Sequence, residues 1–240
     1  MNAADQPSTA HRERKAVVVA DDEDQRFSEL GLFDTATLLE SNEGCGALPT
    51  RIRPLGPEVQ VTGPAFPVRC PAGDNLWLHH AVAVAPPGSV LVACVDGFQE
   101  AGYWGEILTV AAMQRGLAGL VLDGAVRDAT RLLDRGFPVF CTGRCVKGTT
   151  KDPSGPGTLG RAIRIGETDI ETGDAVVGDD DGVIVIASGA VETVRLAATQ
   201  RVEREARILE RIAKGESTIS IYGLPWPADS ANEKGFVHNV

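Results

Sequence analysis

The sequence predicts an α/β protein, because segments with helical periodicity alternate with short buried strands. Residues 104–115 carry apolar side chains at helical spacing, and residues 129–135 form a second such segment that Gly136 closes. Residues 117–122 and 137–141 are short and apolar, as buried strands are. The resulting order of helix, strand, helix and strand is typical of the α/β class.

The first half of the chain continues this pattern. Residues 28–39 and 74–85 are predicted to form helices from the spacing of their apolar side chains. Residues 52–68 alternate around prolines and glycines, which predicts several short strands in a β layer. Residues 89–95 follow a Pro-Pro-Gly turn and form another run typical of a buried strand.

The second half ends in a long helix. Residues 161–165, 175–177 and 183–186 are predicted to be strands. Residues 190–214 place apolar side chains on one face and charged side chains on the other, which predicts an amphipathic helix. Residues 146–160 are rich in glycine, proline and lysine, and we expect a loop of the kind that can cover a site.

Length and composition favour one folded domain with polar ends. The chain has 240 residues, of which 43% are hydrophobic, and this is enough for a single domain with a substantial core. Residues 1–27 are polar and charged, so we expect a flexible N-terminal extension, and residues 224–240 are expected to form an extended tail. Residues 28–223, which include the long C-terminal helix, are the expected domain.

Charge and cysteine content exclude several classes of partner. The net charge of −10 and the lack of a basic patch argue against a nucleic-acid partner. No signal peptide and no apolar run of membrane length is evident, so no membrane association is expected. The five cysteines are an odd number without CxxC spacing, which predicts reduced thiols and a cytoplasmic protein.

The densest chemistry lies between residues 97 and 148. Glu106 is followed by twenty residues and then by the pair Arg127-Asp128, and Asp123 ends a predicted strand. Because these residues fall at the ends of neighbouring elements, they can share one rim. Three carboxylates and one guanidinium would suit a divalent cation and an anionic substrate. The same residues also fit a helix cap and a surface ion pair, worth at most about 1 kcal/mol.

Other candidate metal ligands give weaker signals. His79 and His80 are adjacent, and side chains of adjacent helical residues point about 100° apart, so packing or supporting roles are favoured. Cys141 and Cys145 lack a second Cys/His pair at a finger-like distance, which favours packing over a zinc site. The acidic run at residues 179–182 lacks the ligand spacing of an EF-hand and predicts a tight solvated turn.

The run GYWGEILTVAAMQRGLAGLVLDGAVRDATRLLDRGFPVF resembles the signature of the RraA-like family. This family contains the class II 4-hydroxy-4-methyl-2-oxoglutarate / 4-carboxy-4-hydroxy-2-oxoadipate aldolases, which carry an acidic residue, twenty residues, and then Arg-Asp. The acidic position is commonly Asp in these aldolases, so Glu106 departs from the pattern. The segments GDNLWLHHAVAVAPPGSVLVACVDG and GDAVVGDDDGVIVI also resemble the family, and the similarity covers roughly residues 30–223.

The resemblance implies a fold, an assembly and a metal site. The implied fold is a swivelling β/β/α three-layer domain, and the implied assembly is a homotrimer or homohexamer. Asp128 would bind Mg²⁺ or Mn²⁺, and Arg127 would bind the substrate and orient a metal-bound water. Glu106 would contact the metal through water, as would Glu205 from a neighbouring subunit, with Glu203 as the rival position.

The resemblance also implies a substrate and a reaction. Gly102 and Gly105 lie at a predicted helix start, where free N–H groups favour an anion, although a plain glycine-rich turn fits as well. In the resembled aldolases this backbone holds the substrate carboxylate, which makes Gly102, Tyr103, Trp104, Gly105 and Glu106 substrate-binding candidates. The implied reaction is retro-aldol cleavage of a 4-hydroxy-2-oxo acid to give pyruvate, with oxaloacetate decarboxylation as a side activity.

Three other functions stay open within the resemblance. A different lyase or aldolase of the same scaffold, in a specialised biosynthetic pathway, would keep the metal site and change the pocket. Some relatives are non-catalytic regulators of a ribonuclease, and such a protein does not require Glu106, Arg127 and Asp128 together. Other relatives are methyltransferases, but the sequence lacks a glycine-rich nucleotide loop after a strand to support that function.

Overall fold

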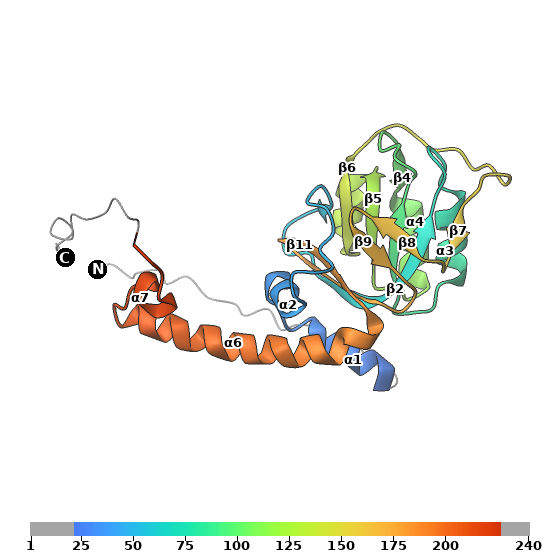
Figure 1. Ribbon diagram of the computed structural model, residues 1–240. Coiled ribbons are helices and arrows are strands. Elements are labelled where there is room, and N and C mark those ends of the chain that lie inside the picture. The colour runs from blue at the N-terminus through green and yellow to red at the C-terminus, as the bar shows by residue number, and fades with distance from the viewer. Residues whose placement is uncertain (1–21, 227–240) are drawn as a thin grey trace, which may run out of the picture.

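The computed structural model describes residues 22–226, which form an α/β body and a projecting helical segment (Figure 1). The helices are α1 (Asp22–Leu30), α2 (Thr35–Ser41), α3 (Leu76–Val84), α4 (Glu106–Gln114), α5 (Ala129–Arg135), the short 3-10 helix η1 (Ser188–Ala190), α6 (Val191–Ala213) and α7 (Thr218–Tyr222). The strands are β1 (Arg53–Pro54), β2 (Val61–Arg69), β3 (Val90–Cys94), β4 (Gly102–Trp104), β5 (Gly119–Val126), β6 (Val139–Arg144), β7 (Thr158–Leu159), β8 (Ile163–Ile165), β9 (Thr168–Ile170), β10 (Ala175–Asp179) and β11 (Gly182–Ile186).

One mixed sheet of nine strands organises the body. Its order is β1-β6-β5-β3-β2-β10-β11, with β4 beside β5 and β7 beside β2. The strands β2, β3, β5 and β6 run parallel, whereas β10, β11 and β1 join antiparallel. The strands β8 and β9 form a separate hairpin. Since the carboxyl ends of parallel strands meet at one edge, the loops after β2, β3, β5 and β6 gather there.

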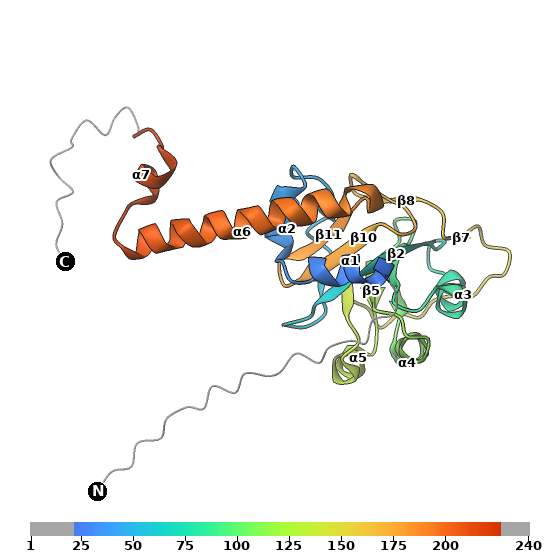
Figure 2. The same ribbon diagram turned by 90° about the horizontal axis from the view of Figure 1, so that it is seen from below.

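Three hydrophobic cores correspond to the layers of the fold. The first lies between the parallel strands and the helices α3, α4 and α5, which Figure 2 shows together on one side of the sheet. The second joins the other face of the parallel strands to β8, β9, β10 and β11. The third lies between β10 and β11 and the helices α1, α2 and α6. The α/β class predicted from the alternation of elements is confirmed.

Strand β2 is longer than the sequence predicts. The prolines and glycines of residues 52–68 favoured several short strands, but the structure has one strand from Val61 to Arg69. Residues 61–64 pair with β10 and residues 65–69 pair with β3, so each half of the strand has its main partner on a different side. A proline inside a strand is tolerated where one side needs no N–H donor.

Element boundaries near the predicted site also differ. Strand β5 runs on to Val126, past the end expected at residue 122, because Ala125 and Val126 pair with both β4 and β6. Residues 102–104 form the strand β4, and the following helix α4 begins only at Glu106. The turn after β5 therefore leaves the sheet beside the start of α4.

The segment expected to form one helix at residues 28–39 is two helices. α1 ends at Leu30, and Thr35 begins α2 after an extended residue. The Asp179 carboxylate accepts hydrogen bonds from the Thr35 N–H at 2.8 Å and from the Thr35 hydroxyl at 2.7 Å. The acidic turn is thus a tight turn, as predicted, and its first residue also caps α2.

The two ends of the chain differ from expectation in one respect. α1 begins at Asp22, inside the segment 1–27 that was expected to be a flexible extension. Residues 1–21 and 227–240 lie outside the described residues, so most of the expected extension and tail does too. Among the helices between residues 22 and 226, none is long and apolar enough to cross a membrane.

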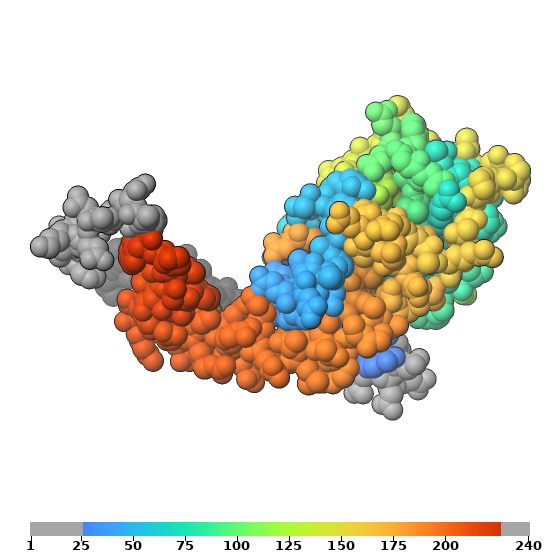
Figure 3. All heavy atoms as spheres, viewed as in Figure 1, coloured from blue at the N-terminus to red at the C-terminus, as the bar shows by residue number. Residues whose placement is uncertain are grey.

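The second half of α6 leaves the body. Val191, Val194 and Ala198 are its buried residues, and all lie in its first three turns. Beyond them, residues 199–222, which we call the arm, extend away from the sheet in Figures 1 and 3. Several apolar side chains of the arm are exposed, namely Val202, Leu209, Ile212 and Tyr222.

Truncation of Leu38 tests the third core. Leu38 is fully buried, so Leu38→Ala leaves a cavity and is expected to lower the free energy of unfolding by about 2–5 kcal/mol. Leu32 is 71% exposed, and Leu32→Ala is expected to change it by less than about 0.5 kcal/mol. Urea denaturation measures both, and equal losses would contradict the packing of α2 against the sheet.

Candidate active site

A pocket of about 170 Å³ lies at the carboxyl edge of the parallel strands. Five segments surround it: the start of α3, strand β4, the first turn of α4, the turn after β5, and the loop after β6. Its lining residues are Asn75, His79, Gly102, Tyr103, Trp104, Gly105, Ile107, Leu108, Arg127, Asp128, Gly148, Thr149 and Lys151. The loop at residues 146–160, expected to cover a site, contributes the last three of these.

Arg127 and Asp128 form the turn between β5 and α5. The Arg127 N–H donates to the Trp104 carbonyl at 2.8 Å, which fastens this turn to β4. Asp128 has φ 57° and ψ 32°, the left-handed conformation that Asp tolerates better than most residues. The Arg127 Nε lies 3.8 Å from Asp128 Oδ2, and both side chains are partly exposed. The two neighbouring side chains therefore present a cation and an anion to the same pocket.

Two glycines make this arrangement sterically possible. A Cβ at Gly102 would lie 2.7 Å from the Cys145 carbonyl oxygen and 2.9 Å from the Arg127 Cβ. A Cβ at Gly105 would lie 2.7 Å from Asp128 Oδ2 and 3.1 Å from the Arg127 Cγ. Both distances of 2.7 Å are shorter than real Cβ contacts, so any side chain at either position displaces a neighbour.

Tyr103 and Trp104 contribute backbone to the pocket, while their side chains are fully buried in the first core. The Tyr103 hydroxyl donates to the Phe98 carbonyl at 2.5 Å and accepts from the Gly73 N–H at 2.7 Å. The Trp104 indole N–H donates to the Thr109 hydroxyl at 2.7 Å. Both aromatic side chains thus anchor the glycine-rich segment to the first core.

The carboxylate of Glu106 is engaged by α5. Arg131 donates to Oε2 at 2.6 Å and Arg135 donates to Oε1 at 2.8 Å. These hydrogen bonds, that of Arg131 first, hold the pKa of Glu106 below its ordinary value of 4.5. The Glu106 backbone N–H donates to Asp128 Oδ2 at 3.2 Å. Glu106 therefore contacts Asp128 through its backbone, and its side chain bridges α4 and α5.

Asp123, which was expected to share the rim, is not part of the pocket. Its carboxylate accepts from Arg51 at 2.8 and 2.7 Å and from Gln99 at 3.2 Å. It lies within β5, three residues before the strand ends. Of the three carboxylates expected at the rim, those of Glu106, Asp123 and Asp128, only Asp128 lines the pocket, beside Arg127.

Asn75, which directly precedes α3 and was not among the site residues expected from the sequence, lies in the pocket wall. Its side-chain N–H donates to the Tyr103 carbonyl at 2.8 Å, which fixes the orientation of the amide. The Oδ1 atom is buried and accepts no hydrogen bond from the residues that the structure describes. A buried acceptor of this kind is suited to a ligand that carries a hydroxyl donor.

His79 and Lys151 complete the polar lining. Burial, and after it the charges of Lys151 and His80, lower the pKa of His79 below its ordinary value of 6.5. At neutral pH the His79 imidazole is therefore uncharged and able to accept a proton. Lys151 belongs to the predicted loop at residues 146–160, and its position beside His79 depends on how that loop folds back over α3.

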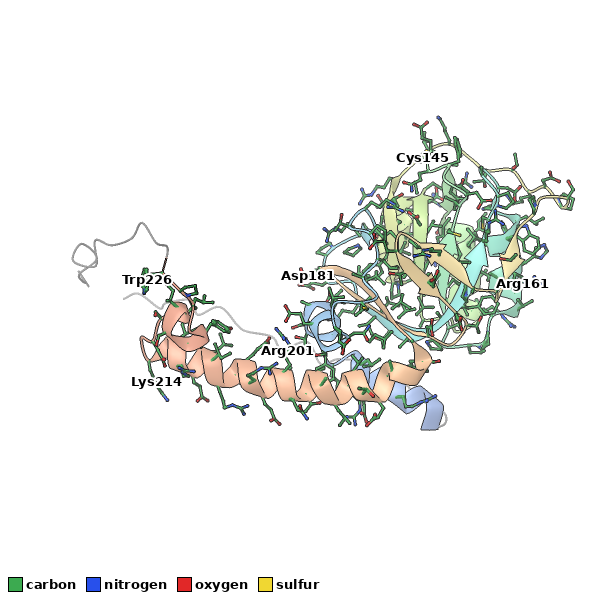
Figure 4. The ribbon with its side chains drawn as sticks, viewed as in Figure 1. Cys145, Arg161, Asp181, Arg201, Lys214 and Trp226 are labelled. Atoms are coloured by element: carbon green, nitrogen blue, oxygen red, sulfur yellow. The ribbon has the colours of Figure 1, made fainter. Side chains whose placement is uncertain are left out.

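Glu205 and Glu203, the candidates for a contribution from a neighbouring subunit, lie on the arm. Glu205 accepts from Arg201 at 2.8 Å, and Arg201 also pairs with Glu40. Figure 4 shows Arg201 on the arm and Cys145 at the end of the body that carries the pocket. Within one chain α6 contacts principally α2 and α1, and neither glutamate lines the pocket.

A second hollow adjoins the pocket on the other side of the Arg127-Asp128 turn. Its volume is about 400 Å³, and Val126, Ala129, Arg144, Cys145 and Val146 line it together with Arg127 and Asp128. Val146 is 94% exposed there. Asp128 is thus accessible from two sides.

The residues present fit a metal that needs few protein ligands. No group of three or more His, Cys, Asp or Glu side chains that could hold an ion occurs between residues 22 and 226. Asp128 alone offers a carboxylate at the pocket. Mg²⁺ is commonly held by one or two carboxylates, with water and substrate oxygens completing its octahedron, so a single carboxylate beside an anion pocket suits it.

The pocket joins an α/β scaffold to a guanidinium and a carboxylate on neighbouring residues. Residues 13–185 match the RraA-like family, described as Aldolase/RraA. The chain belongs to the RraA-like family, and the expected three-layer fold of that type is confirmed.

Relatives in the family differ in their described functions. The chain is 36% identical over 182 residues to a Halalkalibacterium halodurans protein provisionally named a 4-hydroxy-4-methyl-2-oxoglutarate aldolase, covering 75% of this chain and 86% of that protein. RraAS2 of Streptomyces coelicolor, described as an unusual member of the RNase ES inhibitor RraA family, has 26% identity and a TM-score of 0.68 over 80% of this chain and 98% of its own. A Geobacillus kaustophilus protein described as an S-adenosylmethionine:2-dimethylmenaquinone methyltransferase has 29% identity and a TM-score of 0.58 over 64% and 94%.

A methyl group at position 105 tests the close approach of Asp128. Gly105→Ala is expected to push the Asp128 carboxylate out of its place, because the atom in contact is the end of a side chain. The cost in unfolding free energy is expected to be only about 1 kcal/mol for the same reason. A crystal structure of the variant and thermal denaturation measure the two effects. Gly189→Ala is the control, since nothing lies within 4 Å of its added Cβ.

The pH dependence of the Glu106 bridge follows from its lowered pKa. Because the folded-state value lies below 4.5, the bridge stabilises the fold above about pH 4.5 and loses this contribution as the pH falls through the depressed pKa. An NMR titration of the Glu106 carboxyl carbon measures this pKa. The double variant Arg131→Gln, Arg135→Gln is expected to return it toward 4.5, and an unchanged value would disprove the assignment of the two arginines as its cause.

Proposed function

We propose that the protein is a divalent-metal-dependent lyase that cleaves a 4-hydroxy-2-oxo acid by a retro-aldol reaction and releases pyruvate. The observation that carries the proposal is the pocket in which Arg127, Asp128 and the first turn of α4 meet. The similarity to the H. halodurans protein supports 4-hydroxy-4-methyl-2-oxoglutarate as the type of substrate. The pocket volume of about 170 Å³ suits such a small acid.

The lining groups match the functional groups of this substrate class. The helix N-terminus at Gly105 and the Arg127 guanidinium would bind the carboxylate and oxo oxygens of the pyruvyl half. Lys151 would offset the charge of a second carboxylate. The buried Oδ1 of Asn75 would accept a hydrogen bond from the 4-hydroxyl, a donor that an unsubstituted oxo acid lacks.

The proposed reaction moves one proton and one electron pair. The 4-hydroxyl loses its proton, the C3–C4 bond breaks, and its electrons pass to the pyruvate enolate, which is then protonated at C3. His79, uncharged at neutral pH, is suited to accept the hydroxyl proton. Arg127 would stabilise the negative charge that develops on the oxo oxygen. Loss of CO₂ from oxaloacetate gives the same enolate, so the site would also decarboxylate oxaloacetate.

The metal belongs to the proposal as well. Mg²⁺ or Mn²⁺, held by Asp128, would supply Lewis-acid polarisation of the 2-oxo group. Glu106 would contact this ion through water only after releasing Arg131 or Arg135, since both of its carboxylate oxygens are hydrogen-bonded. Glu106 also has a longer side chain than the Asp that is common at this position in the resembled aldolases.

Assembly and location complete the proposal. We propose a homotrimer or homohexamer in which Glu205 or Glu203 of one subunit approaches Asp128 of another through water. The exposed apolar side chains of the arm and the second hollow beside Asp128 support such a contact. All five cysteines are free thiols, which supports a reducing compartment and hence the cytoplasm.

The experiment is pyruvate release from 4-hydroxy-4-methyl-2-oxoglutarate and from oxaloacetate, with Mg²⁺ and with EDTA. Wild type is expected to release pyruvate only with metal. Asp128→Asn keeps the left-handed backbone and removes the charge, and it is expected to lower the rate by about 10²-fold or more. Asp134→Asn is the matched control, because Asp134 is an exposed aspartate in α5, the helix that Asp128 precedes, and does not line the pocket.

Two results would redirect the assignment. Mn²⁺ binding by wild type without pyruvate release from either compound would favour a lyase with another substrate on the same site. Absence of both metal binding and pyruvate release would contradict the enzymatic proposal. It would favour a ribonuclease inhibitor of the kind named in the description of RraAS2.

A further inference from the structure

Three consecutive residues before α3 connect the separate loops that surround the pocket. The Gly73 N–H donates to the Tyr103 hydroxyl, and the Gly73 carbonyl accepts from the Thr150 N–H at 2.8 Å. The Asn75 N–H donates to the Thr150 carbonyl at 3.2 Å. Asp74, which lies between them, is an acidic side chain with only 3% of its surface exposed.

The Asp74 carboxylate has three donors from two segments. Oδ1 accepts from the Leu76 N–H at 2.8 Å, at the start of α3. Oδ2 accepts from the Thr150 hydroxyl at 2.9 Å and from the Asp152 N–H at 2.6 Å. Buried carboxylates with several N–H and O–H donors make strong hydrogen bonds, because the acceptor is charged and water is excluded.

The segment held in this way carries the pocket lining. Lys151 stands between the two residues that Asp74 binds, and Thr149 directly precedes them. The loop containing this segment has a further attachment, the Trp77 indole N–H to the Gly155 carbonyl at 3.2 Å. Asp74 itself does not line the pocket, so any effect on a ligand passes through the two segments that its carboxylate binds, residues 149–152 and the start of α3.

We propose that Asp74 is a positioning residue that latches residues 149–152 against α3 and so holds Lys151 in the pocket. In the part that concerns substrate, this rests on the proposed function, where Lys151 binds the second carboxylate. The latch itself is a property of the fold and is measurable without any substrate.

Asp74→Asn breaks the latch with almost no change in size. The asparagine amide has one oxygen acceptor and one NH2 donor group in place of the two carboxylate oxygens. If the NH2 group takes the place of Oδ1, it faces the Leu76 N–H, and if it takes the place of Oδ2, it faces the donors of Thr150 and Asp152. Asp174 provides a matched control, because it is also buried and its carboxylate accepts from the Glu171 N–H at 2.8 Å and the Ser188 N–H at 3.0 Å, on elements that do not line the pocket.

Hydrogen–deuterium exchange of the full chain tests the latch. Asp74→Asn is expected to speed exchange in residues 146–157 by roughly ten- to a hundredfold, the effect of one charged hydrogen bond, and to leave α6 unchanged. Asp174→Asn is expected to leave residues 146–157 unchanged. Unaltered exchange there in Asp74→Asn, or equal acceleration throughout the chain, would refute the latch. If Asp74→Asn does not fold, Thr150→Val removes only the hydroxyl donor and is expected to give a smaller local increase.

Steady-state kinetics test the link to Lys151. Asp74→Asn is expected to raise KM for 4-hydroxy-4-methyl-2-oxoglutarate about tenfold with kcat changed less than about threefold, as loss of a binding contact does. In a Lys151→Ala background, the same substitution is expected to raise KM no further. Additive effects on KM would overturn the proposal that Asp74 acts through Lys151. If wild type releases no pyruvate, the proposed function fails and the exchange experiment still decides the latch.

Discussion

The pocket depends on one close approach, that of the turn after β5 to the backbone of β4. Arg127 can reach the Trp104 carbonyl, and Asp128 can reach the Glu106 N–H, only because positions 102 and 105 have no Cβ. The parallel sheet sets the distance, since β4 is hydrogen-bonded to the end of β5. Packing of the Trp104 side chain in the first core then fixes the position of the β4 backbone relative to the helix layer. The sheet and the helix layer together determine where the Arg127 and Asp128 side chains point.

Local charge at the rim differs from the charge of the whole chain. The net charge is −10, yet four cationic side chains lie on or beside the rim together with the carboxylate of Asp128, namely those of Arg127, Lys151, Arg131 and Arg135. Glu106 offsets part of the charge of α5 without adding its own to the pocket. Exposed charges more than about 8–10 Å away are screened at physiological salt, so an anionic ligand experiences mainly these nearby groups. The acidic character of the protein therefore does not oppose binding of an anion here.

Sequence reasoning predicted the order of the elements and the Glu106 and Arg127-Asp128 motif, because both are local patterns. It did not predict contacts that depend on packing. Whether Glu106 faces a pocket or α5 depends on how α4 lies against α5, and its arginine partners are 25 and 29 residues away. Asp123 has the same local signature as a rim residue, but its carboxylate binds Arg51, which lies 72 positions earlier in the chain, and does not face the pocket.

Two further features that the sequence did not predict, the continuity of β2 and the meeting of Asn75 with Lys151, have a common physical origin. The prolines of β2 signalled interruption, and only the change of partner strand along β2 explains why they are tolerated. Asn75 and Lys151 are 76 positions apart, which is the difference of their numbers, and no spacing rule relates them. The α/β class could be predicted because periodicity is local, whereas Asn75, His79 and Lys151 reach the pocket wall through long-range contacts with no sequence period.

The left-handed backbone at Asp128 restricts which residues can occupy the position over evolutionary time. Gly and Asn adopt this conformation at little cost, whereas for most other residues it raises the conformational free energy by about 1–2 kcal/mol. Single-nucleotide changes convert an aspartate codon to asparagine or glycine, so the carboxylate can disappear while the turn keeps its shape. Under the proposed function, a descendant of such a scaffold would lose the metal-binding carboxylate in one step without losing its fold, and one family would then contain both catalysts and binding proteins.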